Sequence, residues 1–450
     1  MKNNFIKEDS SFKDSDATVG FLDNKLVRII NKNYKQTFEK FIECGLYEKL
    51  LSKNLIIEHK VLDENEKEII IQPKEIFISY PWEWSFSMLK DAALATLKIQ
   101  KIALRYGFSL KDGNYFNIQF ENNKPLLIDT TSFEEFNSTW VGYNQFCTNF
   151  LAPLLLMAYK DIKLQNLIIS NISGIDLDLT SKLLPIKTWF NFNILSHIHF
   201  HAIFSKKYSN SKKKISIQKI KKEQMIYFID SLISMIKNIN LPKQQTEWGE
   251  YYSFTNYNDI SFKDKKEKVL NFSSLINAKK IIDFGANTGE FSKLFKNSFV
   301  YSTDFDKLAV EYNYLDCKRN GINNIFPLVF DILNPSASLG FLNKERKDLY
   351  ARLKDIDLTL ALALVHHLKI TNNVPFELQA KFFSDFGKNL IVEFIPKDDS
   401  KVKQMLLNRE NDFDDYNIEA FEEEYSKYFK ILKKEQIENS KRILYFMEKK

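Results

Sequence analysis

Hydrophobic and polar positions follow two different patterns along the chain. In residues 21–205, short strand-like runs such as 68–72 and 125–130 are mixed with longer helical stretches, including 86–106. This mixture predicts an α+β domain. Residues 1–20 are polar and show no periodicity, so we expect a flexible N-terminus.

The stretch 206–245 begins with a dense cluster of lysines and continues into a periodic segment. Isoleucines recur there at three- and four-residue spacing: Ile226, Ile229, Ile233 and Ile236. This spacing marks one face of an amphipathic helix, which Pro242 ends. We therefore predict a basic linker followed by a helix. Charge runs of this kind are usually solvated, so nucleic acid is not expected as a partner.

Strand-like and helical patterns alternate through residues 246–450. The strand-like runs, separated by helical stretches, are KKIIDFG, SFVYSTDF, NIFPLVFDI, DIDLTLALAL and NLIVEF. The first two helical stretches run through Phe295 and Asn320. Alternation of this type predicts a parallel, doubly wound, Rossmann-like α/β sheet.

Composition narrows the class of protein. The 450 residues have a net charge of +6, are 44% hydrophobic and 27% charged, and are typical of a globular protein. The three cysteines, Cys44, Cys147 and Cys317, are scattered, which favours a reducing, cytoplasmic location without disulfides or a cysteine-based metal site. The apolar run 150–159 is too short to cross a bilayer, so no membrane span is expected.

The stretch IIDFGANTGEFS contains the strongest motif. A strand leads into Asp283, Gly285, Ala286, Asn287 and Gly289, and a helix is predicted to begin near Glu290. Small residues let the backbone turn sharply beneath a ligand. The next strands end in Asp304, nineteen residues after Gly285, and in Asp331. Because parallel strands end at one edge of the sheet, these acids are expected to meet there.

With these motifs in this order, the C-terminal domain resembles class I S-adenosylmethionine-dependent methyltransferases. The resemblance implies S-adenosyl-L-methionine as cofactor. It implies that Asp283 and the glycine-containing loop bind the methionine part of the donor, that Asp304 with Phe305 binds the ribose, and that Asp331 with Ile332 binds the adenine. A plain tight turn would explain the glycines but leave the two later acids unexplained.

Candidate catalytic residues follow the fourth and fifth strands. His366 and His367 lie at the edge where an acceptor would be bound, and a histidine can take a proton from a hydroxyl near neutral pH. Packing or hydrogen bonding alone is the alternative role. Glu393 ends the fifth strand and is a candidate for binding acceptor hydroxyls. The chain lacks the Asn/Asp-Pro-Pro-Tyr/Phe signature of amino-methylating enzymes, which disfavours methylation of adenine N6 or of glutamine. O-methylation of a hydroxyl is the leading hypothesis.

A second constellation lies in the N-terminal half. Asn117 follows Asp112 by five residues, and Asp129 follows Asn117 by twelve. This spacing resembles the catalytic hairpin of small-molecule kinases of the aminoglycoside or choline kinase type. No glycine-rich loop precedes it. Active phosphotransfer, a degenerate kinase-like domain and chance spacing therefore remain open.

Five longer segments occur in order along the chain: SYPWEW, LKDGNYFNIQF, IDTTSFE, HHLKITNNVPFE and EFIPKDDSKV. This layout of the whole chain resembles large bacterial methyltransferases related to the nodulation protein NoeA. It implies that the acceptor is a small molecule or a surface glycan or glycolipid. The alternatives are a bifunctional kinase–methyltransferase and a non-catalytic cofactor-binding protein. The sequence predicts no oligomeric state.

The alternating histidines of SHIHFHAIF, His197, His199 and His201, would share one face of a strand and could then bind zinc. On a helix they would not converge. No cysteine or carboxylate nearby completes such a site. We therefore expect a packed or solvated histidine cluster and no metal.

Overall fold

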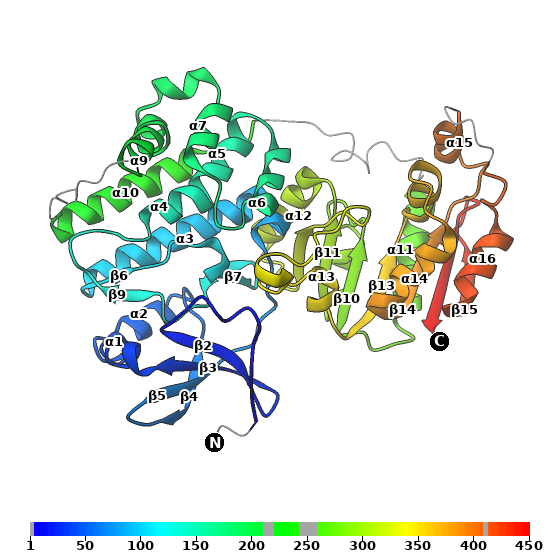
Figure 1. Ribbon diagram of the computed structural model, residues 1–450. Coiled ribbons are helices and arrows are strands. Elements are labelled where there is room, and N and C mark those ends of the chain that lie inside the picture. Colours follow the sequence, from blue (N-terminus) through cyan, green and yellow to red (C-terminus); the bar gives the residue numbers. More distant parts are fainter. Residues whose placement is uncertain (1–3, 210–219, 243–258, 408–412) are drawn as a thin grey trace. The chain divides into compact units, whose positions relative to one another are not determined.

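The computed structural model describes residues 4–209, 220–242, 259–407 and 413–450. Its contacts divide the chain into two compact units, each described here by itself (Figure 1). Unit 1 comprises Met1–Gln244 and Ser336–Lys347, and unit 2 comprises Gln245–Pro335 and Asp348–Lys450. The chain therefore passes between the units three times. The expected boundary at residue 246 lies outside the described residues.

Unit 1 begins with an antiparallel sheet of order β1-β2-β3-β5-β4. Its strands are β1 (Phe5–Lys7), β2 (Ala17–Leu22), β3 (Lys25–Asn31), β4 (His59–Glu64) and β5 (Glu68–Pro73). The prediction that residues 1–20 are flexible is wrong for the described part, because β1 and β2 belong to this sheet. Six residues of β2 pair with β3, and β1 pairs with β2.

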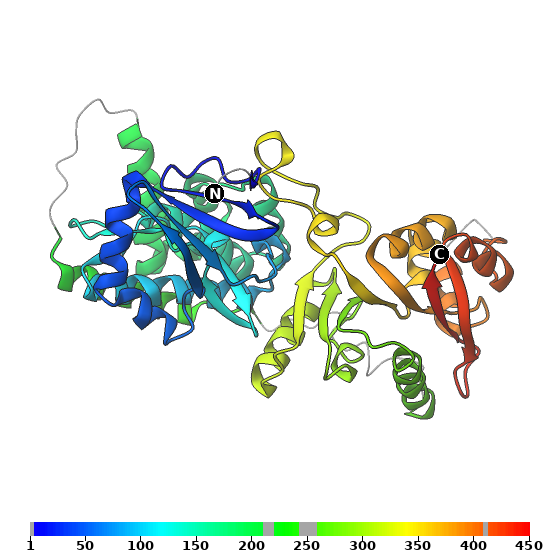
Figure 2. The ribbon, with the colours of Figure 1, turned by 90° about the horizontal axis from the view of Figure 1, so that it is seen from below.

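Helices form most of the rest of unit 1, as Figure 2 also shows. The longest, α3, spans Phe86–Arg105 and packs against α10 (Lys222–Asn238). The amphipathic helix expected beyond residue 224 is therefore present as α10, but it belongs to unit 1 rather than to a linker. Lys101 on α3 binds Asp230 on α10 at 2.6 Å. The basic residues 210–219 lie outside the described residues.

The other helices of unit 1 are short, and two hairpins lie among them. The helices are α1 (Lys32–Glu43), α2 (Leu46–Leu51), α4 (Tyr143–Phe146), α5 (Ala152–Tyr159), α6 (Leu167–Ser170), α7 (Leu177–Leu183), α8 (Phe192–Ile194) and α9 (His201–Ser209). Hairpin β7 (Ile118–Glu121)–β8 (Lys124–Leu127) and the pair β6 (Phe108–Leu110)–β9 (Phe133–Glu135) complete it.

Unit 2 is built on a twisted sheet of order β12-β11-β10-β13-β14-β16-β15. Its first five strands in this order are parallel, and β16 is antiparallel to both neighbours. The strands are β10 (Lys280–Phe284), β11 (Phe299–Asp304), β12 (Ile325–Val329), β13 (Ile356–Ala361), β14 (Gly387–Phe394), β15 (Phe429–Gln436) and β16 (Ile443–Lys449). The first strand, β10, lies inside the sheet. The chain adds β11 and β12 on one side of it and then returns to add β13 and β14 on the other side. This reversal opens a crevice at the carboxyl ends of the parallel strands.

Helices of unit 2 connect these strands. They are α11 (Asp259–Ser273), α12 (Lys307–Asn320), α13 (Leu349–Arg352), α14 (Phe376–Phe386), α15 (Ser400–Leu406) and α16 (Ile418–Ser426). The helix predicted from Glu290 through Phe295 is wrong, because only a short 3-10 turn, Ser292–Leu294, forms there. Within this turn, the hydroxyl of Ser292 donates a hydrogen bond to Asp283 at 2.7 Å.

No helix within the described ranges has the length and hydropathy needed to cross a bilayer.

Candidate functional site

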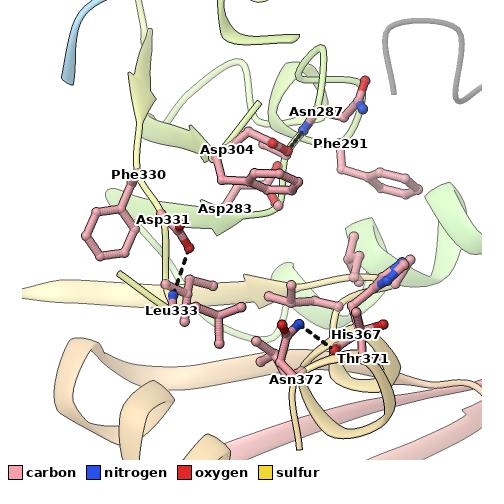
Figure 3. A pocket seen from close by; sticks show the side chains of 18 of the residues that line it. Asp283, Asn287, Phe291, Asp304, Phe330, Asp331, Leu333, His367, Thr371 and Asn372 are labelled. Carbon is pink, nitrogen blue, oxygen red and sulfur yellow. Dashed lines mark hydrogen bonds between the residues drawn. The ribbon is translucent and has the colours of Figure 1, made fainter. Parts of the chain in front are cut away.

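A cavity of about 360 Å³ opens at the carboxyl ends of the parallel strands of unit 2. Most of the predicted donor-binding residues line it, namely Asp283, Gly285, Ala286, Asn287, Asp304, Phe305, Asp331 and Ile332, and so does His367, a predicted catalytic residue. Figure 3 shows Asp283 and Asp304 on one side of it and His367, Thr371 and Asn372 on the other. The sequence motifs thus meet in space because their strands end at one edge.

The backbone of the glycine-containing loop holds Asp304 in place. One carboxylate oxygen of Asp304 accepts a hydrogen bond from the backbone N–H of Asn287 at 2.8 Å. The other accepts one from the N–H of Asp306 at 2.8 Å. Gly285 has φ +70° and Asn287 has φ +52°, a left-handed conformation that glycine and asparagine tolerate best. These two residues therefore turn the loop so that the N–H of Asn287 points at Asp304.

Gly289 has a different task from the one predicted, since it does not line the cavity. A Cβ at this position would lie 2.6 Å from Oδ1 of Asn313. Asn313 in turn donates a hydrogen bond to the Ser302 hydroxyl, which lies 3.0 Å from the Ser292 hydroxyl, and Ser292 donates its proton to Asp283. Gly289 thus leaves space for Asn313, which belongs to a buried polar network that ends in a hydrogen bond to Asp283.

The two deepest acids lie in an unfavourable environment for negative charge. Burial, with a smaller contribution from the charge of Asp304, raises the pKa of Asp283 to about 7, despite the hydrogen bond from Ser292. Burial also raises the pKa of Asp304 to about 6. A ligand with positive charge would compensate both carboxylates. The cavity therefore favours a cationic ligand.

Lys265 is a cavity residue that the motif search missed. It lies on α11, its side chain is 2% exposed, and its ammonium binds Glu393 at 2.7 Å. Burial lowers the pKa of Lys265, and the negative charge of Glu393 opposes that shift. The signal was present in the sequence, because Lys265 shares its helix face with the core residues Val269 and Phe272.

The prediction that Glu393 binds acceptor hydroxyls is wrong. Glu393 is fully buried and does not line the cavity, so it cannot contact acceptor hydroxyls. Besides binding Lys265, it accepts a hydrogen bond from the N–H of Ala363 at 2.8 Å. Arg442 lies 3.7 Å away and binds Asp399 at 2.9 Å. Glu393 thus positions Lys265 and the loop after β13.

The two histidines after β13 occupy different environments. His367 lines the cavity, and burial lowers its pKa to about 4, so its imidazole is neutral at neutral pH. His366 is 2% exposed and does not line the cavity. Burial, with the charges of neighbouring cations, lowers the pKa of His366 well below its usual value. Of this pair, only His367 is placed to contact a ligand in the cavity.

Asp331, at the end of β12, accepts a hydrogen bond from the N–H of Leu333 at 2.9 Å (Figure 3). This turn directs the chain around the cavity, where Phe305 and Leu333 expose apolar surface. A flat, partly apolar ring with polar edges would be bound there by both kinds of contact. The adenine of S-adenosylmethionine is such a ring.

The donor as a whole fits the site chemistry. S-adenosylmethionine has an ammonium and a sulfonium that would offset the buried acids, a ribose diol that a carboxylate can bind, and a carboxylate that a lysine can bind. The cavity offers acids, a lysine and apolar surface in one space. The residues present therefore fit this group.

The kinase-like constellation lies in unit 1, where β7 and β8 bring its residues near one another. Asp129 forms an ion pair with Arg28 on β3 and accepts hydrogen bonds from the hydroxyls of Thr131 and Ser132, both at 2.7 Å. Burial raises the pKa of Asp129, but Arg28 and the hydroxyl donors together hold it at about 2.

Asn117 and Asp112 are the other two members of the kinase-like constellation. Asn117 donates to the hydroxyl of Ser132 at 3.0 Å. Burial, followed by the charge of Asp129, raises the pKa of Asp112 to about 6. The kinase-like character of unit 1 stays a prediction.

The three histidines of SHIHFHAIF lie on helical backbone, at η6 (Leu195–Phe200) and the start of α9. His197 bonds to the Tyr143 hydroxyl at 2.7 Å, and His201 stacks on the same ring. His199 bonds to Ser181 and Thr188. Across the described residues, His, Cys, Asp and Glu side chains form no group of three that could bind a metal.

The strand order and the site define the class of unit 2: it has the Rossmann-like α/β fold of class I methyltransferases. Nodulation protein NoeA of Rhizobium meliloti (strain 1021) is 31% identical over 462 residues, covering 98% of this chain and 95% of NoeA. The chain therefore belongs to the NoeA family. No family model matches the sequence.

Solved structures also match parts of the chain. N-methyltransferase NodS from Bradyrhizobium japonicum WM9, in complex with S-adenosyl-L-homocysteine, is 12% identical, with 45% of this chain and 99% of NodS covered and a TM-score of 0.33. Magnesium protoporphyrin IX methyltransferase from Synechocystis PCC 6803 is 14% identical, covering 45% and 93%, with a TM-score of 0.32. WbdD, solved with a kinase inhibitor, is 15% identical, covering 49% and 47%, with a TM-score of 0.29. At these values we draw no conclusion about activity from them.

Proposed function

We propose that this protein is an S-adenosylmethionine-dependent methyltransferase that methylates a hydroxyl group. The observation that carries the proposal is the meeting of three acids at the carboxyl ends of β10, β11 and β12, around one cavity. Two of these acids are buried and need a cationic ligand. S-adenosylmethionine, when bound, supplies a methyl group that its sulfonium already activates.

In this proposal, four residues each bind a different part of the donor. Asp283 binds the ammonium, Asp304 accepts hydrogen bonds from the ribose hydroxyls, and Asp331 accepts one from the adenine amine. Lys265 binds the carboxylate of the methionine part. Support for Lys265 comes from its place in the cavity and from Glu393, which fixes its ammonium at 2.7 Å. The ammonium and the carboxylate of the donor would then each face a side chain of opposite charge.

His367 is the proposed catalytic base. Its neutral ring can accept the acceptor's hydroxyl proton as the oxygen attacks the methyl carbon, and the sulfur keeps the electron pair of the broken bond. Alignment of the two reactants contributes most of the acceleration, because the donor needs no further activation. His366 plays no direct part in this proposal.

The acceptor class rests on the family and on the site. The absence of the amino-methylation signature supports a hydroxyl, and the relationship to a nodulation protein supports a surface glycan, a glycolipid or a related small molecule. Phosphotransfer by unit 1 is not adopted, because Asp129, which would have to hold the metal, is paired with Arg28.

Calorimetric titration with S-adenosylmethionine tests the proposal. We expect Asp304→Ala to weaken donor binding about 10- to 100-fold, since it removes hydrogen bonds to a charged acceptor. Asp316→Ala is the matched control, because Asp316 binds Lys293 and does not line the cavity. If the wild type fails to bind the donor, the proposal is wrong.

A further inference from the structure

One surface of unit 1 displays large hydrophobic side chains to solvent. They lie on the residues that follow α7 and on the first turn of α9, here called the aromatic segment (residues 185–204; α7 and α9 are labelled in Figure 1). Three of its side chains are almost fully exposed: Ile186 at 79%, Phe190 at 87% and Phe192 at 79%. Trp189, Phe200, Ile203 and Phe204 are exposed by 39–49%. Exposed apolar groups gathered in this way usually mark a binding surface.

Internal contacts hold the aromatic segment in place. The Thr188 hydroxyl bonds to Nε2 of His199 at 3.0 Å and to the carbonyl of Pro185 at 2.7 Å. His199 also bonds to Ser181 on α7, and Trp189 stacks on its ring at 4.2 Å. The exposed side chains therefore project from an anchored scaffold.

The sequence around the aromatic segment has one sign of charge. Between residues 179 and 222 there are ten lysines and no aspartate or glutamate, although one of them, Lys182, is paired with Asp178 on α7 at 2.6 Å. Among the described side chains, Lys187 and Lys206 are exposed at the two ends of the segment. Apolar side chains flanked by lysines are the combination that favours an anionic lipid surface.

We propose that the aromatic segment docks unit 1 on an anionic membrane surface. Phe190, Phe192 and Ile186 would enter the boundary between headgroups and acyl chains, while the lysines bind lipid phosphates. A second copy fits less well, because an isologous contact would bring two lysine-rich segments together. Nucleic acid fits less well, because the aliphatic side chains Ile186 and Ile203 offer no ring for a base to stack on. This inference does not depend on the methyltransferase proposal.

Sedimentation of the full-length protein with vesicles tests the proposal. We expect binding to vesicles of phosphatidylcholine with phosphatidylglycerol, and much weaker binding to phosphatidylcholine alone. Phe190→Ser with Phe192→Ser should weaken the binding at least about tenfold, because two inserted rings are lost. Ile6→Ser with Val61→Ser is the control, since these residues of unit 1 are 68% and 55% exposed but lie outside the segment. Lys187→Glu should weaken binding and reduce its dependence on salt.

Trp189 provides a second test that leaves Phe190 and Phe192 unchanged. Vesicles containing brominated phosphatidylcholine should quench the fluorescence of the wild type, and Trp189→Phe should lose that quenching. Failure of the wild type to bind anionic vesicles, or equal binding by the Phe190→Ser, Phe192→Ser variant with an unchanged melting temperature, would overturn the proposal. So would single-stranded RNA binding, or self-association, that this variant abolishes without any vesicle binding.

Discussion

Asp283 makes donor binding sensitive to pH at the scale of a single residue. Its pKa of about 7 means that the folded protein without ligand holds a proton there that the unfolded chain loses near pH 4. This contribution to stability therefore falls as pH rises from about 4 to about 7. The donor's ammonium needs the ionised form.

We expect donor affinity to fall about tenfold for each pH unit below about 7, because a proton must leave Asp283 on binding. Calorimetry at several pH values in buffers of different ionisation enthalpy measures both the affinity and the proton released. Asp283→Asn should bind weakly and with a flatter pH profile. A wild-type affinity independent of pH between about 5.5 and 7.5 would contradict the assignment.

His367 allows a separation of catalysis from binding. We expect His367→Asn to lower the rate of methyl transfer about 10²- to 10⁴-fold, the usual contribution of a positioned base, with little change in the affinity for the donor. Transfer of labelled methyl groups to an extracted glycolipid fraction measures the rate. Asn372→Ala, a cavity variant without a titratable group, is the control. Equal losses of affinity and rate in His367→Asn would argue for a packing role.

At the scale of elements, α11, β14 and β16 are joined by a buried ionic network. Lys265 comes from α11, Glu393 from β14, and Arg442 lies immediately before β16. Each charge is buried, so each depends on its partner to remain ionised.

We expect Glu393→Gln to destabilise the protein by about 3–5 kcal/mol, because it leaves a buried ammonium without its counter-charge. Urea unfolding measures this loss, and donor binding should weaken because Lys265 is no longer fixed. Glu435→Gln on β15, an exposed position, is the control. An unfolding midpoint equal to that of the wild type would show that the network contributes little.

The elements also show what local patterns can predict. The strands ending in Asp283, Asp304 and Asp331 were predictable because buried parallel strands are continuous apolar runs. Strands β1 and β2 were not, because they are short, lie in or beside a polar stretch, and form through pairing of β1 with β2 and of β2 with β3. The short 3-10 turn after Gly289 was also not predicted. Its Ser292 bonds to Asp283 across the loop, a contact that a local pattern does not reveal.

At the scale of the whole molecule, a segment from the methyltransferase-like half belongs to unit 1. Ser336–Lys347 follows Asp331 by only a few residues, yet its partners lie in the N-terminal half. Glu345 binds Lys13 at 2.8 Å, and the guanidinium of Arg346 lies 3.9 Å from the centre of the Phe116 ring. The Tyr80 hydroxyl accepts a hydrogen bond from the N–H of Lys347 at 3.0 Å.

We expect Arg346→Ala to destabilise unit 1 by about 1–2 kcal/mol, through loss of the cation–π contact and of the stem packed on Phe116. Hydrogen exchange measured by mass spectrometry should show faster exchange near Tyr80 and Phe116, with unchanged exchange in β10 and β11. Lys344→Ala, which removes an exposed ion pair with Asp9, is the control. Unchanged exchange near Phe116 would mean that the segment does not stabilise unit 1.

The sequence by itself determined the α/β class of the C-terminal half, the strand ends that carry the acids and the family resemblance. These features are local or ordered along the chain, so spacing reveals them. Tertiary structure decided which residues share the cavity. It placed Lys265 inside, left Glu393 and His366 outside, and gave Gly289 the task of making room for Asn313. Burial and long-range partners decide these roles, and both depend on elements far apart in the sequence.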